Sequence, residues 1–156
     1  MERVRIGFLA NLSTESILNL FAPIAIAASM LLASSAFAQE DQQVTQARAA
    51  AASWLVLMDA GQYPATWTQS ASAFQSAVTQ EKWQAAAAQV RAPLGAVMSR
   101  TFKQAQFTRT LPNAPAGDYV VIQYDTTFAN RAGLVETITP MRDKDGTWRV
   151  SGYFIR

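Results

Sequence analysis

The chain has 156 residues, carries 13 Lys and Arg against 11 Asp and Glu, and contains neither cysteine nor histidine. These two absences exclude a Ser-His-Asp triad, a cysteine nucleophile, an imidazole base and a zinc site with nitrogen or sulfur ligands. The net charge of +2 comes from single, scattered basic residues rather than from a basic face, so we expect no binding to nucleic acid.

The N-terminus has the three parts of a secretory signal peptide. Two arginines within the first five residues give it a positive start, residues 17–32 form an apolar run, and Ala36-Phe37-Ala38 offers the small-x-small pattern of a cleavage site. A retained membrane anchor is the alternative, and Pro23 argues against a stable span. We therefore predict a signal peptide at 1–38, a periplasmic or secreted product, and no membrane contact after cleavage.

Residues 39–156 are expected to form one domain that begins with a long helix. Apolar residues between 44 and 58 recur every three or four positions, which is typical of a helix with one buried side. Gly61 suits the left-handed conformation that ends such a helix. The predicted buried face consists of Val44, Ala47, Ala51, Trp54, Leu55 and Met58.

Two shorter helices are predicted next. Pro64 suits the first position of a helix that carries Trp67, Ala71 and Phe74 on one side. Thr79 can cap a third helix, which Pro93 and Gly95 would end. The apolar stripe of this third helix is Trp83, Ala86, Ala87 and Val90.

Beyond residue 95 the hydrophobic period changes from about 3.6 to 2, which indicates β-strands. A loop rich in proline and glycine at 111–117 and turns at 130–133 and 143–146 separate the apolar segments. The four predicted strands span 96–108, 119–129, 135–142 and 147–155. Because short connections join antiparallel neighbours, we predict an α+β domain in which three helices pack on a four-stranded antiparallel meander, with the four tryptophans in or near the core.

The alternation within the strands predicts which side chains face the helices. In the second strand Val120, Ile122, Tyr124 and Phe128 share the apolar face, which leaves Asp125 on the other. In the third strand Pro140 cannot donate to the sheet, so a bulge or an early end is expected there. In the last strand the predicted inner residues are Trp148, Val150, Gly152 and Phe154, and the predicted outer residues are Arg149, Ser151 and Tyr153.

Several short motifs together resemble a family of small exported bacterial proteins that is catalogued as domain of unknown function number 4019. The resemblance covers nearly all of residues 39–156 and implies no activity, because none is established for the family. The order of elements is also similar to the cone-shaped α+β fold of nuclear-transport-factor-2-like and cystatin-like proteins. The motif residues are Trp54-Leu55, Leu57, Asp59-Ala60-Gly61, Tyr63, Trp67, Arg91 to Gly95, Ser99-Arg100, Leu111-Pro112, Pro115, Gly117 to Tyr119, Glu136-Thr137 and Asp145 to Ile155.

Four polar residues are the predicted ligand-binding candidates. Arg100 and Glu136 occupy strands with apolar neighbours, and a buried pair of this kind could orient an anionic or polar ligand. A cross-strand ion pair or a clamp between a helix and the sheet, with a purely structural role, is the alternative. Tyr124 and Tyr153 could donate hydrogen bonds to the same ligand or simply anchor the edge of the core.

Three other charged residues have structural interpretations. Arg91 is expected to bind carbonyl groups at a helix end or an acidic neighbour, and Asp59 is expected to bond the turn at residues 61–63. Asp125 would be a general base if it lay in an apolar pocket, but the alternation places it outside. We therefore assign no catalytic residue, metal or cofactor.

The resulting hypothesis is an exported, non-enzymatic domain that binds a small ligand or another envelope protein, with a homodimer as one arrangement. The alternative is a small enzyme for proton transfer or hydrolysis that uses Asp125 or Glu136 with a tyrosine in a cone-shaped pocket. An enclosed apolar pocket that contains a carboxylate would favour the enzyme. A filled interior with an exposed apolar patch would favour the binding domain.

Overall fold

The computed structural model describes residues 22–156, with side chains described from Gln39 onward. Residues Gln39–Arg156 form one compact unit. The predicted signal peptide at 1–38 lies outside the residues that are described in full and stays a prediction. No helix within residues 22–156 combines the length and the apolar character that crossing a membrane requires.

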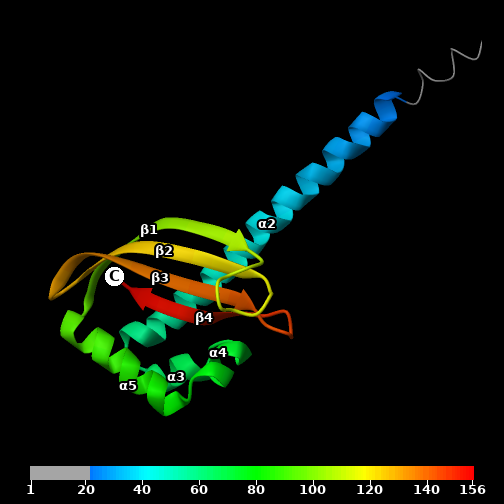
Figure 1. Cartoon of the computed structure of the whole chain (residues 1–156). Coiled ribbons are helices and arrows are strands. Elements are labelled where there is room, and N and C mark those ends of the chain that lie inside the picture. Colours follow the sequence, from blue (N-terminus) through cyan, green and yellow to red (C-terminus); the bar gives the residue numbers. More distant parts are fainter. Residues whose placement is uncertain (1–21) are drawn as a thin grey trace, which may run out of the picture. The chain divides into compact units, whose positions relative to one another are not determined.

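The unit is an α+β domain built on a four-stranded antiparallel sheet with the strand order β1-β2-β3-β4 (Figure 1). The predicted meander is therefore confirmed. The part of helix α2 that follows residue 38 crosses one face of the sheet, and the shorter helices lie on the β4 side. The elements are α2 (Ala22–Asp59), α3 (Tyr63–Thr68), α4 (Ser72–Ala77), α5 (Gln80–Arg91), the 3₁₀ turn η1 (Ala92–Leu94), β1 (Val97–Thr108), β2 (Tyr119–Phe128), β3 (Arg131–Arg142) and β4 (Trp148–Ile155).

The helix count differs from the prediction because the second predicted helix is two helices, α3 and α4. The break falls at Ala71, whose backbone is extended with φ −60° and ψ 149°. The Ala71 N–H donates to the carbonyl of Val150 in β4 at 2.9 Å. The fully buried Ala71 therefore bonds to the edge of the sheet instead of continuing the helix.

The turn between β2 and β3 lies earlier than predicted. Phe128 pairs with Arg131, so only Ala129 and Asn130 form the turn, and residues 131–134 belong to β3. The Asn130 N–H donates to the carbonyl of Leu94 at 2.9 Å, which fixes this turn against the end of η1. A tertiary hydrogen bond therefore sets the turn, and local composition alone could not place it.

A bulge in β4 changes which residues of this strand face the helices. Thr139 pairs with Gly152 and Pro140 with Val150, which leaves Ser151 without a partner in β3. The predicted irregularity at Pro140 is confirmed, but the predicted faces of the last residues are wrong. Tyr153 points to the helices and packs against the core, whereas Phe154 is 69% exposed on the other face.

The core lies between α2 and the sheet and contains three buried tryptophans, with Trp67 partly buried beside them. Thr66 of α3 orients two of the tryptophan rings through hydrogen bonds. Thr66 is fully buried, its hydroxyl accepts the Trp83 indole N–H at 2.8 Å, and its carbonyl accepts the Trp54 indole N–H at 2.9 Å. The predicted location of the tryptophans is confirmed.

We predict that Thr66→Val destabilises the domain by about 2 kcal/mol, because it leaves the buried indole N–H of Trp83 without an acceptor. Valine has a similar size, so loss of packing contributes little. The measurement is the free energy of unfolding from urea titration. Thr68→Val is the matched control, since Thr68 is exposed on the same helix and its hydroxyl bonds the Pro64 carbonyl. Equal effects of the two substitutions would contradict the role given to Thr66.

Candidate functional site

Six residues from six different elements meet in what we call the charge cluster. Its centre is Glu136 in β3, whose side chain is only 1% exposed. Two arginines, two carboxylates, a threonine and a tyrosine take part, so the formal charges cancel. The members are Asp59 of α2, Arg91 of α5, Arg100 of β1, Thr126 of β2, Glu136 of β3 and Tyr153 of β4.

The Glu136 carboxylate accepts hydrogen bonds from four side chains. Oε2 accepts from Arg100 Nε at 2.6 Å and from the Thr126 hydroxyl at 2.9 Å. Oε1 accepts from the Tyr153 hydroxyl at 2.5 Å, Arg100 Nη2 at 3.2 Å and Arg91 Nη1 at 3.3 Å. Because a buried carboxylate is strongly disfavoured unless it is paired and hydrogen-bonded, these donors are what allow Glu136 to occupy the interior.

Asp59 closes the cluster on its solvent side, with 29% of its side chain exposed. It accepts from Arg91 Nη2 at 2.9 Å and from Arg100 Nη1 at 2.7 Å. Gly61, with φ +70°, ends α2 in a left-handed cap, so Asp59 stands in the last turn of the helix. A carboxylate there is unfavourable for the helix dipole, and the two arginines offset this.

The surroundings shift the pKa values of Asp59 and Tyr153 in directions that favour the paired state. Burial alone would raise the pKa of Asp59, but the hydrogen bonds and charges of Arg100 and Arg91 outweigh it and hold the pKa below 3.8. Burial and then the Glu136 carboxylate raise the pKa of Tyr153 well above 10. Tyr153 therefore stays protonated and donates its hydrogen bond over the whole neutral range.

Three of the four predicted ligand-binding residues are bonded to one another, and the fourth lies beside them. Arg100, Glu136 and Tyr153 meet in the charge cluster, as the interpretation of a buried arginine-carboxylate pair requires. Tyr124 pairs with Glu136 across β2 and β3, and its ring packs edge-on against Phe102, with 6.1 Å between ring centroids. The ligand-binding role of all four stays a prediction.

Asp59 and Arg91 were not among the candidate site residues. The Asp59 carboxylate binds two arginines rather than the turn at 61–63, so the prediction for that residue is wrong. For Arg91, the predicted acidic neighbour is confirmed. Asp125 faces outward as predicted and pairs with Lys103 at 3.0 Å on the surface. In the sequence, Asp59 and Arg91 are charged residues near predicted helix ends and belong to the motifs of the family resemblance. That combination could have marked them as candidate site residues.

The polar groups of the charge cluster are engaged with one another. Both carboxylates are occupied by arginines, and the Tyr153 hydroxyl accepts from Arg91 at 2.9 Å while it donates to Glu136. A shallow hollow of about 300 Å³ lies beside Asp59 and Arg91, at the ends of α2 and α5. An anion that entered there would have to replace Asp59 on the arginines.

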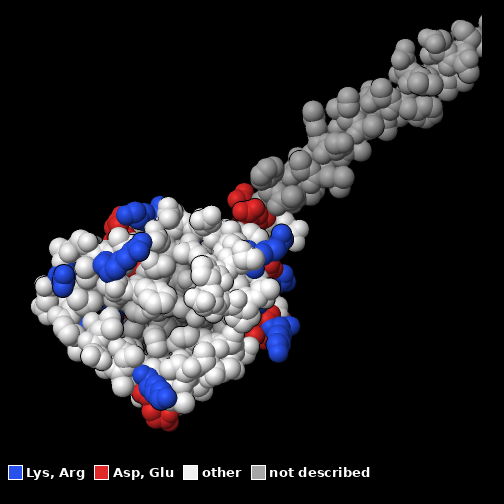
Figure 2. Space-filling view, viewed as in Figure 1, with Lys and Arg blue, Asp and Glu red and all other residues white. Residues whose placement is uncertain are grey.

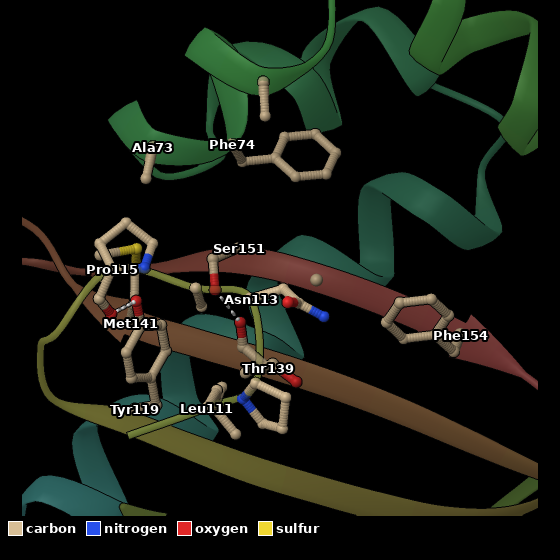
Figure 3. A pocket seen from close by; sticks show the side chains of 14 residues that line it. Ala73, Phe74, Leu111, Asn113, Pro115, Tyr119, Thr139, Met141, Ser151 and Phe154 are labelled. Atoms are coloured by element: carbon tan, nitrogen blue, oxygen red, sulfur yellow. Dashed lines mark hydrogen bonds between the residues drawn. The ribbon is translucent and has the colours of Figure 1, made fainter. Parts of the chain in front are cut away.

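A second place with the shape of a binding site is the outer groove, on the face of the sheet turned away from α2. It has a volume of about 250 Å³ and lies between α4, the loop at 111–115 and the outer side of β3 and β4 (Figure 3). Its walls include Phe74 of α4, Leu111 of the loop and Phe154 of β4. None of its fourteen lining residues is charged.

The groove has a small number of polar groups. Thr139 and Ser151 form part of its floor, and the Ser151 hydroxyl donates to the Thr139 carbonyl at 2.8 Å. Asn113 stands at the loop with a positive φ of 60°, a conformation that is uncommon outside glycine. The buried Tyr119 ties the loop down by donating from its hydroxyl to the Pro115 carbonyl at 2.7 Å.

Charged groups are not concentrated on the face shown in Figure 2. Over residues 39–156 that face is uncharged across its centre, with Lys, Arg, Asp and Glu at its rim. Within the part of the chain that the structure describes, no group of three or more Asp or Glu side chains is placed to hold a metal ion.

Comparison with known proteins gives a family but no activity. The family described as "Protein of unknown function (DUF4019)" matches residues 50–153. No curated protein and no solved structure matches the chain. The matched range contains all six residues of the charge cluster and most of the residues that carry the sequence resemblance.

We predict that Glu136→Gln lowers the free energy of unfolding by about 3 kcal/mol, because it leaves two buried arginines with a single carboxylate. Urea titration followed by tryptophan fluorescence measures this loss. Asp125→Asn is the matched control: it breaks an ion pair on the exposed sheet face and should change stability by less than about 0.5 kcal/mol. A loss at Glu136 no larger than at Asp125 would refute the central role of this carboxylate.

The lowered pKa of Asp59 predicts an acid-sensitive fold. Because the folded-state pKa lies below 3.8, the stability from this group is fully present above roughly pH 5 and is lost as the pH falls through the folded pKa. Asp59→Asn should therefore be less stable at pH 7 but lose less further stability between roughly pH 5 and pH 2. Unfolding titrations at a series of pH values give the two curves, and parallel curves would contradict the prediction.

Proposed function

Because the chain belongs to the family described as "Protein of unknown function (DUF4019)", which assigns it no activity, we propose a function from its geometry. The domain is an exported, non-enzymatic binding domain of the cell envelope. Its binding surface is the outer face of the sheet around the outer groove, where it holds a small ligand or a segment of another envelope protein.

The observation that carries this proposal is the contrast between the two faces of the sheet. On the inner face, tryptophans and the charge cluster fill most of the space between helices and strands. On the outer face, an uncharged and mostly apolar groove stays open, with Phe154 largely exposed beside it. Exposed apolar surface next to a concave site is typical of a place that meets a partner or ligand.

The enzyme hypothesis receives less support from the same geometry. A general base needs a carboxylate that can reach a substrate, and Glu136 is enclosed by its donors. Asp125 lies on the surface with Lys103. The lining of the outer groove includes no carboxylate. A binding role does not require a carboxylate that can reach a substrate.

Export is proposed from the sequence features at 1–38, and one structural boundary supports it. The compact unit begins at Gln39, directly after the Ala36-Phe37-Ala38 pattern of the predicted cleavage site. Cleavage at that point would remove the apolar run and leave the compact unit whole. A periplasmic or secreted location follows from this proposal.

The predicted ligand-binding residues Arg100, Glu136, Tyr124 and Tyr153 define a second place for an anionic ligand. Binding there requires that Asp59 leave Arg91 and Arg100, with which it makes bonds of 2.7–2.9 Å. The outer groove requires no such displacement. We therefore place ligand binding in the groove and give the charge cluster a structural role.

Native mass spectrometry of protein purified from the periplasm of its own host tests the function. We expect a retained small molecule, a second copy or a bound partner on the wild-type domain. Ala73→Phe places a ring in the groove, since Ala73 lines it, and should lose the added mass. Ser76→Phe is the matched control on the exposed side of the same helix. Bare monomers for all three proteins would overturn the proposal.

A further inference from the structure

The size and the walls of the outer groove limit its ligand to a small molecule with a ring. Drug-sized ligands need pockets of about 300–1,000 Å³, whereas this groove has about 250 Å³. Aromatic side chains stand on two sides of it, Phe74 on α4 and Phe154 on β4 (Figure 3). Aromatic rings pack favourably in edge-to-face and offset arrangements, so a single ring suits this space better than a linear chain.

A hydroxyl group in the floor gives the groove a polar contact. Thr139 is 9% exposed as a whole residue, and its Oγ1 makes no hydrogen bond to any residue in the part of the chain that the structure describes. Its backbone carbonyl accepts from the Ser151 hydroxyl. The Thr139 hydroxyl is not among the buried polar atoms that lack a partner, so it is open to the groove. The Thr139 hydroxyl is therefore available to a ligand.

Gly152 keeps this hydroxyl uncovered. It pairs with Thr139 across the bulge, and its backbone does not have the positive φ that would itself call for glycine. A Cβ at this position would lie 3.8 Å from Thr139 Oγ1 and 3.8 Å from a ring atom of Phe154. The missing side chain thus leaves a gap between the hydroxyl and the ring, where a ligand can touch both.

The absence of charged lining residues excludes charged ligands. A carboxylate or phosphate would be desolvated in the groove without a cation to pair with. A sugar has a hydroxyl on nearly every carbon, and Thr139, Ser151 and Asn113 are too few to satisfy them, since Ser151 already donates to the Thr139 carbonyl. A mostly apolar molecule with one polar group remains.

We propose that the outer groove binds an uncharged, single-ring aromatic molecule that carries a hydroxyl group, a phenol in chemical class. Its ring lies between Phe74 and Phe154, and its hydroxyl bonds Thr139 Oγ1. This inference rests on the proposed binding function and adds the class of ligand to it.

The test is a titration followed by amide resonances in nuclear magnetic resonance, with four probes that each isolate one feature. Phenol has the ring and the hydroxyl, toluene only the ring, cyclohexanol only the hydroxyl, and benzoate a charge. We expect phenol to shift the resonances of Thr139, Gly152 and Asn113, with a dissociation constant on the order of 1 mM for a ligand of about seven non-hydrogen atoms. Toluene and cyclohexanol should bind more weakly, and benzoate should not bind.

Variants separate the groove from non-specific contact. Thr139→Val should weaken phenol binding roughly 3- to 10-fold through loss of one hydrogen bond and leave toluene binding unchanged. Thr127→Val is the matched control, because Thr127 lies on the outer face of β2 and does not line the groove. Ala73→Phe should abolish binding of both ring compounds. Equal binding of phenol and toluene, or no effect of Ala73→Phe, would overturn the inference.

The phenol titration and the mass spectrometry together show whether only the proposed ligand class fails or the binding function fails as well. Suppose phenol does not bind, but protein from its host carries a mass that Ala73→Phe loses. The class of ligand is then wrong, and the binding function stands. If phenol does not bind and the host protein carries nothing, both proposals fail.

Discussion

The pairing of Glu136 with Arg100, Arg91 and Tyr153 is the contact on which the rest of the domain depends. A carboxylate with 1% exposure is costly to bury without such partners, so the ends of α2 and α5 and all four strands meet at one point. The apolar core supplies most of the burial, and the alternation of its residues specifies the strand register. The ion pairs add directional contacts between the elements that surround it.

The paired charges and the tryptophans packed around Thr66 fill much of the inner face of the sheet. A hollow of about 350 Å³ remains there beside Ala50, Trp54 and Trp148. The outer groove exists because the break at Ala71 places α4 beside β4 and because Tyr119 holds the loop at 111–115 over the strands.

The β-bulge at Ser151 affects both faces of the sheet. Pro140 has no N–H to offer, and β4 bulges at Ser151 opposite it. The bulge turns Tyr153 inward, where its hydroxyl completes the charge cluster, and turns Phe154 outward, where its ring borders the outer groove. The same shift in register pairs Gly152 with Thr139. In a regular strand Tyr153 would face outward and Phe154 inward. The charge cluster would then lack its tyrosine, and the outer groove would lack one aromatic wall.

The sequence by itself determined the class of fold, the order of the strands, the burial of the tryptophans and the irregularity at Pro140, because periodicity and turn chemistry are local properties. It also identified Arg100, Glu136 and Tyr153 as polar residues worth attention. Only the tertiary structure decided that Asp59 and Arg91 join them, that Ala71 breaks a helix and that Phe154 faces outward. Each of these depends on a contact between residues far apart in the chain, and no local pattern contains that information.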